Sequence, residues 1–346
     1  MLHRALHSDE PAVVASYAWD RLIVDPLPGP RAVDDFDGLR PVGGYNYAFA
    51  EHTKPRGRAG STMPRLASSL PYQLLLLDPS GGAVGMRRQI IELVDVYDVR
   101  TVDVVDVGGD AVARPKEPGL RSPLADGLVL AACQGLPARV SVLIAGPGLD
   151  GEVPEATVLA TPGLSTRAHL GPSDVEPFRS VLDWHPSEAT ALLAAAALGL
   201  RGAVEVRDSG LVVELTDRSA RISTLPLSAA LAVNTLASNL VQTTSLAEAE
   251  DVARTVCGFS EIDYERTKAE RIRPTRPHRI ASDTDAAVDT FEHDAAARGI
   301  DYVTFRRIAE ATALDPASAA DLRAHLVATR PDHLAWPLWS LRPIAA

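Results

Sequence analysis

The chain has 346 residues, of which 46% are hydrophobic and 23% are charged. This length leaves room for about two domains, and the composition is that of an ordinary globular protein, so a single small module and a disordered or fibrous chain are both excluded. Lys and Arg number 34 and Asp and Glu number 45, a formal net charge of −11 that argues against attraction of the whole surface to nucleic acid or anionic lipid.

The first predicted elements are two strands, at residues 12–16 and 22–24. Residues 25–30, which include three prolines and a glycine, break any regular element after them. Residues 31–71 then form a long segment rich in Gly, Pro, Arg and aromatic residues. A segment of this length inside a compact domain is typical of a functional cover. We expect a lid or pocket wall that becomes ordered when ligand binds, with a small helical insertion as the alternative.

Three βα units follow, each with an apolar run that ends at a loop of Gly and Asp. The runs are residues 74–77, 102–105 and 140–145, and the loops are residues 78–82, 106–110 and 146–152. Continuous apolar runs are typical of strands buried on both faces of a parallel sheet. We expect helices over residues 86–94 and from Ser122, a suitable N-cap that precedes Pro123. The sequence therefore predicts an α/β fold with a Rossmann-like parallel sheet flanked by helices.

The second half predicts a helix over residues 187–198 and a hairpin of residues 204–206 with 211–215. A basic run follows, and we expect a domain boundary near residue 280. Beyond it, helices are predicted at 286–297 and 317–328, and Trp336 and Trp339 are expected to pack back onto the body. The expected organisation is a Rossmann-like domain over residues 1–280 and a small helical C-terminal unit over 281–346.

Cysteine usage and hydropathy indicate the cellular setting. Cys133 and Cys257 lie far apart and outside any C-x-x-C pair, which is typical of reduced thiols. Asp20 and Arg21 interrupt the first apolar stretch, so no export signal is expected. The most apolar run, residues 191–200, is about half of the ~20 residues that a membrane span needs. We therefore expect a cytoplasmic protein without a membrane partner.

Loops at the carboxyl ends of neighbouring parallel strands meet at one edge of a sheet, so their polar residues are expected to share a site. Glycines there allow tight turns, and their N–H groups can hold phosphate or carboxylate oxygens. The structural alternative is that strand-to-helix turns favour Gly, with Asp capping the next helix. No dinucleotide fingerprint and no phosphate-loop motif is present. The ligand-binding candidates in these loops are Asp78, Gly81, Gly82, Asp106, Gly108, Gly109, Gly146, Gly148, Asp150 and Glu152.

The second loop carries the candidates for chemistry. Asp106 and Asp110 offer oxygen ligands without His or Cys neighbours, which suits a hard cation such as Mg²⁺, although both could equally serve as caps at a helix N-terminus. Asp110, Glu117 and Asp126 are the candidates for general acid–base catalysis. The first turn of a helix explains Asp126 as well.

Three features elsewhere have structural alternatives. Glu261 and Asp263, beside Tyr264, could orient a substrate amine or hydroxyl, but a surface of ion pairs explains them equally well. His185 lies between Trp184 and Pro186 and is interpreted as structural. The basic run is interpreted as interdomain electrostatics in preference to an anion site. It comprises Arg266, Lys268, Arg271, Arg273, Arg276 and Arg279.

The stretch from Asp106 to Asp126 resembles the signature of the family catalogued as domain of unknown function 1152, with its Gly-Gly-Asp turn, Glu117 and Ser122-Pro123 before Asp126. The resemblance extends to residues 25–30, 77–83, 146–151 and 260–265 and covers roughly residues 12–275. It implies a Rossmann-like α/β protein and no particular reaction. Members begin with a strand and a Gly-rich loop, whereas this chain has no glycine before Gly29. We expect that the first βα unit is missing or that the start is placed late.

These observations predict an enzyme that acts on a small polar or phosphorylated metabolite, of the transferase or hydrolase class, in a crevice at the carboxyl ends of the strands. The alternative is a catalytically inactive protein that binds a ligand or serves as a scaffold. A small molecule is the expected partner, nucleic acid is not, and the sequence leaves a homo-oligomer open.

Overall fold

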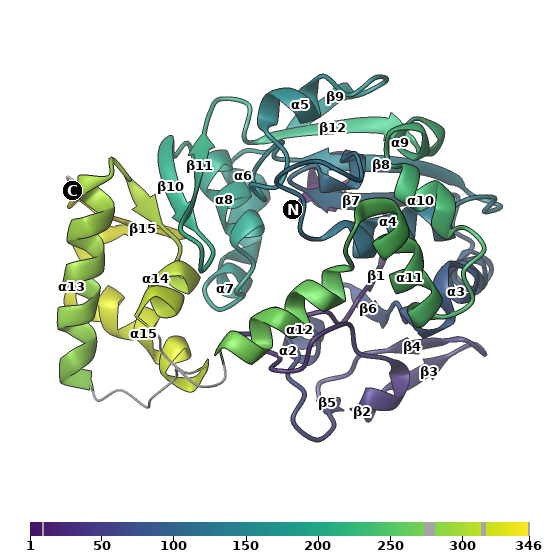
Figure 1. Cartoon of the computed structure of the whole chain (residues 1–346), viewed down its shortest axis with the longest axis horizontal. Helices are drawn as coiled ribbons and strands as arrows, with labels where there is room; N and C mark the ends of the chain where they lie inside the picture. Colours follow the sequence, from purple (N-terminus) through teal and green to yellow (C-terminus); the bar gives the residue numbers. More distant parts are fainter. Residues whose placement is uncertain (9, 273–280, 313–315, 345–346) are drawn as a thin grey trace.

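The computed structural model describes residues 1–8, 10–272, 281–312 and 316–344. Figure 1 shows the last three helices gathered at one end of the molecule and the sheet β7-β8-β12-β9 at the other, with the helix α12 (Glu261–Ile272) running between them. The fold is mixed α/β, as predicted. Among the described residues, no helix has both the length and the apolar character that a membrane span requires.

The first sheet has the order β1-β6-β4-β3. Its strands are β1 (Val13–Ser16), β6 (Gln73–Leu76), β4 (Asn46–Ala48) and β3 (Arg40–Val42). Strands β1 and β6 are parallel, and Val13 pairs with Gln73, whereas β4 is antiparallel to both β6 and β3. The predicted strands at 12–16 and 74–77 therefore form and pair with each other.

The segment 31–71 is folded to a larger extent than its composition predicts. It contains β3, β4, the pair β2 (Phe36–Asp37) and β5 (Lys54–Pro55), the 3-10 turn η1 (Val33–Asp35) and the helix α2 (Met63–Ser69). The rings of Phe36 and Phe49 meet edge to face in a small core with Leu74 and Leu76. These contacts replace the long loop that was expected, and the proposed movement of this segment on ligand binding stays a prediction.

The second sheet has the order β7-β8-β12-β9. Its strands are β7 (Thr101–Val107), β8 (Arg139–Ala145), β12 (Arg221–Pro226) and β9 (Ser165–His169). Strands β7 and β8 are parallel over their full length, and β12 is antiparallel to both β8 and β9. On one face Val142 and Ile144 join a core with α3 (Gly82–Val96), α4 (Pro123–Ala132), α10 (Thr235–Leu240) and α11 (Leu246–Cys257). On the other face Ala145 packs against α8 (Glu188–Ala197), so β8 is buried on both sides, as its apolar run predicts.

The three predicted βα strands do not lie in one hydrogen-bonded sheet. Strand β6 pairs with β1 and β4, while β7 and β8 belong to the second sheet, whose next strand, β12, is antiparallel. Among the described residues, β1 and β7 are each the last strand of their sheet, and no hydrogen-bonded ladder joins them. The parallel arrangement is thus confirmed within the pairs β1–β6 and β7–β8, and the Rossmann-like detail of one continuous sheet is not confirmed.

The third sheet has the order β11-β10-β13-β15-β14 and joins the two expected domains. The predicted hairpin forms from β10 (Gly202–Val206) and β11 (Leu211–Leu215), and β10 also pairs with β13 (Tyr302–Val303). The tail supplies β14 (Leu334–Ala335) and β15 (Leu338–Ser340) besides the helices α13 (Ala281–Ala297), α14 (Phe305–Ala311) and α15 (Pro316–Thr329). The C-terminal unit is therefore not purely helical, because its strands extend the sheet that the hairpin begins. The boundary expected near residue 280 lies outside the described residues.

Two local predictions have clear outcomes. Trp339 is buried against Phe305 and its Nε1 donates to Glu292 at 2.7 Å, as expected for a ring that packs onto the body. Residues 22–24 form a turn and not a strand, because the N–H groups of Val24 and Asp25 both bond to the carbonyl of Arg21. The remaining helices are α1 (Leu2–His7), α5 (Glu155–Leu159), α6 (Pro172–Val175), α7 (Arg179–Leu182) and α9 (Leu227–Val233), and the other 3-10 turns are η2 (Pro79–Gly81), η3 (Asp110–Val112), η4 (Glu176–Phe178) and η5 (Pro331–His333).

Candidate functional site

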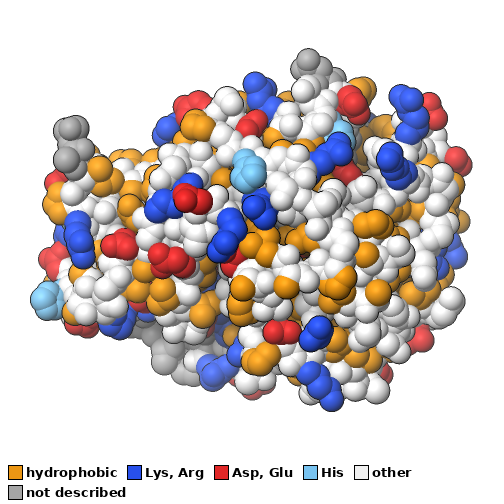
Figure 2. Space-filling model, turned by 90° about the horizontal axis from the view of Figure 1, so that it is seen from above, with side chains coloured by type: hydrophobic (Ala, Val, Ile, Leu, Met, Phe, Trp, Pro, Cys, Tyr) orange, Lys and Arg blue, Asp and Glu red, His pale blue; other side chains and the backbone are white. Residues whose placement is uncertain are grey.

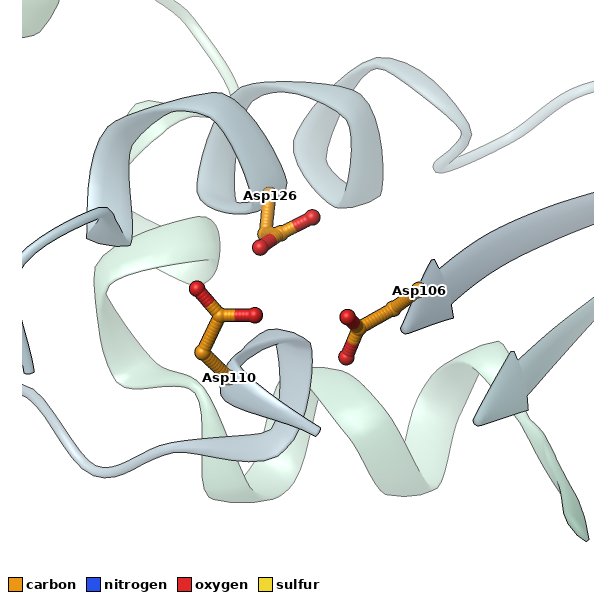
Figure 3. Close-up of side chains that lie close together, drawn as sticks. All are labelled: Asp106, Asp110 and Asp126. Atoms are coloured by element: carbon orange, nitrogen blue, oxygen red, sulfur yellow. The ribbon is translucent and has the colours of Figure 1, made fainter. Parts of the chain in front are cut away.

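Three aspartates meet where β7 ends and α4 begins. Asp106 is the second-last residue of β7, Asp110 opens the turn η3, and Asp126 lies in the first turn of α4. One carboxylate oxygen of each lies within 4.8 Å of the others, and Figure 3 shows the three side chains pointing toward a common centre. Asp106 and Asp110 are buried, whereas Asp126 is partly exposed.

The turn between Asp106 and Asp110 requires glycine. Gly108 and Gly109 have φ angles of 129° and 117°, which side chains rarely adopt. A Cβ on Gly108 would lie 2.2 Å from Cγ of Asp150, and a Cβ on Gly109 would lie 2.7 Å from Val158. These two glycines therefore let the chain turn back tightly, so that Asp110 faces Asp106.

The loop after β8 adds two more carboxylates. Its backbone is tied to the first loop by the bond from Gly148 N to the carbonyl oxygen of Gly108, 2.6 Å. Asp150 Oδ1 accepts from Glu152 N at 3.0 Å, but Asp150 Oδ2 is buried and accepts no hydrogen bond from the described residues. Burial, followed by the nearby charges of Asp110 and Glu152, raises the pKa of Asp150 well above its usual value.

Glu152 is held as an anion at the N-terminus of α4. Its carboxylate accepts from the backbone N–H groups of Arg121 and Ser122 at 2.6 and 2.9 Å and from Arg207 Nη2 at 2.9 Å. Burial opposes ionisation, but the charge of Arg207 and these hydrogen bonds lower the pKa of Glu152 overall. Ser122 was predicted to cap the helix with its side chain, but its Oγ makes no cap hydrogen bond because it bonds to neighbouring carboxylates. Its Oγ lies instead 2.6 Å from Glu152 Oε1 and 3.1 Å from Asp110 Oδ2.

The aspartate cluster is electrostatically unfavourable by itself. Burial raises the pKa values of Asp106, Asp110 and Asp126, and the charges of neighbouring carboxylates raise them further. The raised pKa values favour the protonated forms of these carboxyls when no cation is present. This arrangement suits the binding of either protons or a metal ion.

Helix α12 brings Glu261 close to Asp126 and to the first turn of α4. Glu261 is buried, which raises its pKa, and its Oε2 accepts from Ala125 N in the first turn of α4 at 3.4 Å. Arg21 Nη1 lies 3.8 Å from Glu261 Oε1. Asp263, on the same helix, bonds instead to Arg254 and Arg266 at the surface, and these bonds lower its pKa. The structure thus brings Glu261 to the cluster and leaves Asp263 in a network of ion pairs.

The first βα loop does not join the carboxylates. Asp78 accepts from Ser80 N and Val33 N at 2.8 and 2.9 Å, so its two oxygens serve as local caps. A Cβ on Gly82 would lie 2.5 Å from the carbonyl oxygen of Thr243, and this segment also takes the first N–H groups of α3. Gly82 therefore packs against the backbone of residues 243–245, whereas nothing lies within 4 Å of the position that a Cβ on Gly81 would take. The hydrogen bonds of Asp78 are those of the alternative in which Asp caps the following turn. This loop does not join the carboxylates because it follows β6, which belongs to a different hydrogen-bonded sheet from β7 and β8.

The other candidates occupy separate positions. Glu117 is partly exposed in the loop before α4, and no hydrogen bond joins its side chain to the described carboxylates. Gly146, with φ 58°, packs against Leu149 and shapes the loop after β8. His185 has a pKa lowered by burial, and its Nδ1 accepts from Ser187 N at 3.3 Å, in keeping with a structural role.

The basic run is described only in part. Arg266 pairs with Glu250, and Lys268 pairs with Asp208 of the β10–β11 turn. Arg271 Nε donates to the carbonyl oxygen of Thr267 within its own helix. Arg273, Arg276 and Arg279 lie outside the described residues. Arg207 is the site residue that sequence reasoning missed, because a hairpin turn carries no signal that its side chain reaches another loop.

Comparison with curated proteins and with solved structures finds no match. A family model described as protein of unknown function, DUF1152, matches residues 1–269, which include every residue of the carboxylate site. The chain belongs to this family.

Proposed function

We propose that this protein is an enzyme that binds a divalent cation such as Mg²⁺ at Asp106, Asp110 and Asp126 and acts on a small polar or phosphorylated metabolite. The observation that carries the proposal is the set of three carboxylate oxygens within 4.8 Å of one another. Oxygen ligands without His or Cys suit Mg²⁺, and a cation would remove the repulsion between these buried groups. The unbonded Asp150 Oδ2, next to Gly108, supplies a further acceptor with no use in the metal-free protein.

We assign different roles to the side chains of the site. Asp106 and Asp110 are buried and held by Ala111 N and Ser122, which suits fixed ligands. Asp126 is partly exposed, and burial and the charges of Asp110 and Asp106 raise its pKa, which suits a general acid or base that faces the substrate. A bound cation would polarise a phosphoryl or carbonyl oxygen. Glu117 stays a candidate for proton transfer from the loop that precedes α4.

Two further observations support a cytoplasmic protein with a small-molecule partner. Cys133 and Cys257 are both free thiols. The face in Figure 2 mixes positive and negative side chains without an extended basic area, which favours a small ligand over nucleic acid.

The test is a reaction screen with a matched variant. The full chain is incubated with mixtures of phosphate esters and nucleotides, with and without Mg²⁺, and the products are followed by ³¹P nuclear magnetic resonance. We expect turnover that requires Mg²⁺ and that Asp110→Asn abolishes with only a modest loss of binding. As a control, Asp217→Asn changes a carboxylate that is 96% exposed, so its turnover should equal that of the wild type.

A different result would favour the ligand-binding alternative. If the wild-type chain retains a ligand in native mass spectrometry, returns it chemically unchanged, and Asp110→Asn alters only its affinity, the protein binds without catalysis. That outcome would contradict the enzyme proposal.

A further inference from the structure

Arg207 has a left-handed backbone conformation, which is energetically unfavourable for a residue with a side chain. It follows β10 directly in the hairpin turn and has φ 60°, in the left-handed region. Such a conformation costs on the order of 1 kcal/mol or more for a residue other than glycine and is found disproportionately at functional sites. Glycine would avoid this cost, so the turn retains an arginine at the expense of stability.

Hydrogen bonds to the backbone of Arg207 hold this conformation. Arg207 N donates to both carboxylate oxygens of Glu188, each at 3.1 Å. Glu188 in turn accepts from Thr304 Oγ1 at 2.5 Å and lies 3.6 Å from Arg306, so residues of the C-terminal unit hold the carboxylate. The backbone of the turn is therefore clamped, and the guanidinium is directed toward the carboxylate site.

The guanidinium of Arg207 reaches the carboxylate site through its Nη2 alone. Its Nη2 donates to Glu152 Oε1 and to the carbonyl oxygen of Asp150, at 2.9 and 2.6 Å. In the described part of the chain, no hydrogen bond is recorded from its Nε or Nη1, and the side chain is 23% exposed. A chain of hydrogen bonds connects the guanidinium to the aspartate cluster: Arg207 bonds to Glu152, Glu152 to Ser122, and Ser122 to Asp110.

We propose that Arg207 binds the anionic group of the substrate and that this group is a phosphate, held between the guanidinium and the cation site. This inference rests on the proposed function and deepens it. A planar guanidinium presents paired donors that match the oxygens of a phosphate. Among the described residues, Arg207 and Arg21 are the cations that act on these carboxyls, and Arg207 is the one whose backbone N–H is held by a buried carboxylate.

Charge determines the order of binding. The site gathers six carboxyl groups, those of Asp106, Asp110, Asp126, Asp150, Glu152 and Glu261. Their ionised forms repel a phosphate and a bound cation removes that repulsion, so the cation binds first and the anion second.

The experiment measures two affinities separately by titration calorimetry on the full chain: Mg²⁺ alone, and inorganic pyrophosphate in the presence of saturating Mg²⁺. In wild type we expect pyrophosphate to bind only when Mg²⁺ is present. Arg207→Gln should weaken pyrophosphate about 10- to 100-fold, as for loss of a charged hydrogen-bond donor, with Mg²⁺ affinity nearly unchanged. Arg207→Lys, which keeps the charge beside Glu152, should weaken it about 10-fold because the second donor is lost.

A matched control and three outcomes make the test decisive. Arg201→Gln removes a guanidinium paired with Asp217 at the surface and should change neither affinity. Unchanged pyrophosphate affinity in both Arg207 variants would overturn the inference. An equal loss of Mg²⁺ affinity in Arg207→Lys would also overturn it, because Arg207 would then only hold Glu152 in place. If wild type binds Mg²⁺ but not pyrophosphate, the inference fails while the cation site stands.

Discussion

Gly108 couples the two loops that form the carboxylate site. A methyl group at this position would collide with the carboxylate of Asp150 and would also strain a backbone with φ 129°. We expect Gly108→Ala to destabilise the protein by about 2–4 kcal/mol and to displace Asp150. Thermal or denaturant unfolding measures the cost.

Gly135→Ala is the matched control for that prediction. Gly135 also has a positive φ, 77°, but nothing lies within 4 Å of its missing Cβ. This variant should carry only the backbone strain, about 1 kcal/mol. Equal costs for the two substitutions would show that the contact with Asp150 has no energetic consequence.

Asp126 is expected to reduce the stability of the metal-free protein. Burial and the charges of Asp110 and Asp106 raise its pKa, so ionising it in the folded state is unfavourable. We expect Asp126→Asn to stabilise the metal-free protein at neutral pH by on the order of 1 kcal/mol, which corresponds to about 1–2 °C in Tm for a chain of 346 residues. The same substitution should abolish stabilisation by Mg²⁺. A lower Tm without metal, with the Mg²⁺ response intact, would contradict the assignment of Asp126.

At the level of residues, the sequence predicted the centre of the site better than its surroundings. Asp106, Asp110 and Asp126 lie within one βα unit, so local spacing was enough to bring them together. Asp78 was wrongly expected to join them, because its strand pairs in another sheet. Arg207 enters from a hairpin more than fifty residues away along the chain from Glu152, and no local pattern predicts such a contact.

Helix α12 connects the carboxylate site to the Pro-rich segment at residues 25–30. Glu265 is buried, and its Oε2 accepts from Trp19 Nε1 at 2.9 Å and from Gly29 N at 2.8 Å. Glu265→Ala leaves two donors without a partner, and we expect a loss of about 2–4 kcal/mol in the free energy of unfolding. Glu270→Ala, at an exposed position of the same helix, should change it by less than about 0.5 kcal/mol. Similar effects of the two substitutions would argue against this anchoring role.

The division between the first and second sheets makes a separate prediction about local stability. Strand β8 is paired on both sides, whereas β1 and β7 are each paired on one side among the described residues. Backbone N–H groups on the open sides of β1 and β7 should exchange with solvent much faster than those of β8. Hydrogen exchange measures this directly, and equal protection of β7 and β8 would contradict an open edge at β7.

Apolar runs predicted the existence of the strands but not their partners. The runs at 74–77, 102–105 and 140–145 appear as β6, β7 and β8 within one or two residues. The antiparallel insertion of β12 beside β8, and the pairing of β13 with β10, depend on contacts between distant segments. Short strands in the tail, of two or three residues, are too brief for a periodic pattern, which explains why only helices were expected there.

The whole molecule should depend on pH in a direction that the cluster sets. The pKa values of Asp106, Asp126, Asp150 and Glu261 are raised, so the folded protein holds protons that the unfolded chain releases. Their contribution to stability is therefore present below the ordinary carboxyl pKa of about 4 and is lost as the pH rises through the raised values.

Mg²⁺ should reverse this loss, because the cation binds the deprotonated carboxylates. We expect the increase in Tm caused by Mg²⁺ to be small near about pH 5 and larger near about pH 8. In Asp106→Asn with Asp126→Asn, both the pH-dependent loss and the response to Mg²⁺ should shrink. A response to Mg²⁺ that falls as the pH rises would contradict this assignment.

The most direct measurement is a crystal structure of the full chain with Mn²⁺ in place of Mg²⁺, with anomalous scattering used to locate the metal. The account predicts an anomalous peak between the carboxylates of Asp106, Asp110 and Asp126, at the roughly 2.0–2.2 Å distances typical of oxygen ligands to small divalent cations. The peak should be absent in Asp110→Asn and present in Asp217→Asn. A wild-type crystal at saturating Mn²⁺ with no peak there, or with metal bound only elsewhere, would contradict the central claim.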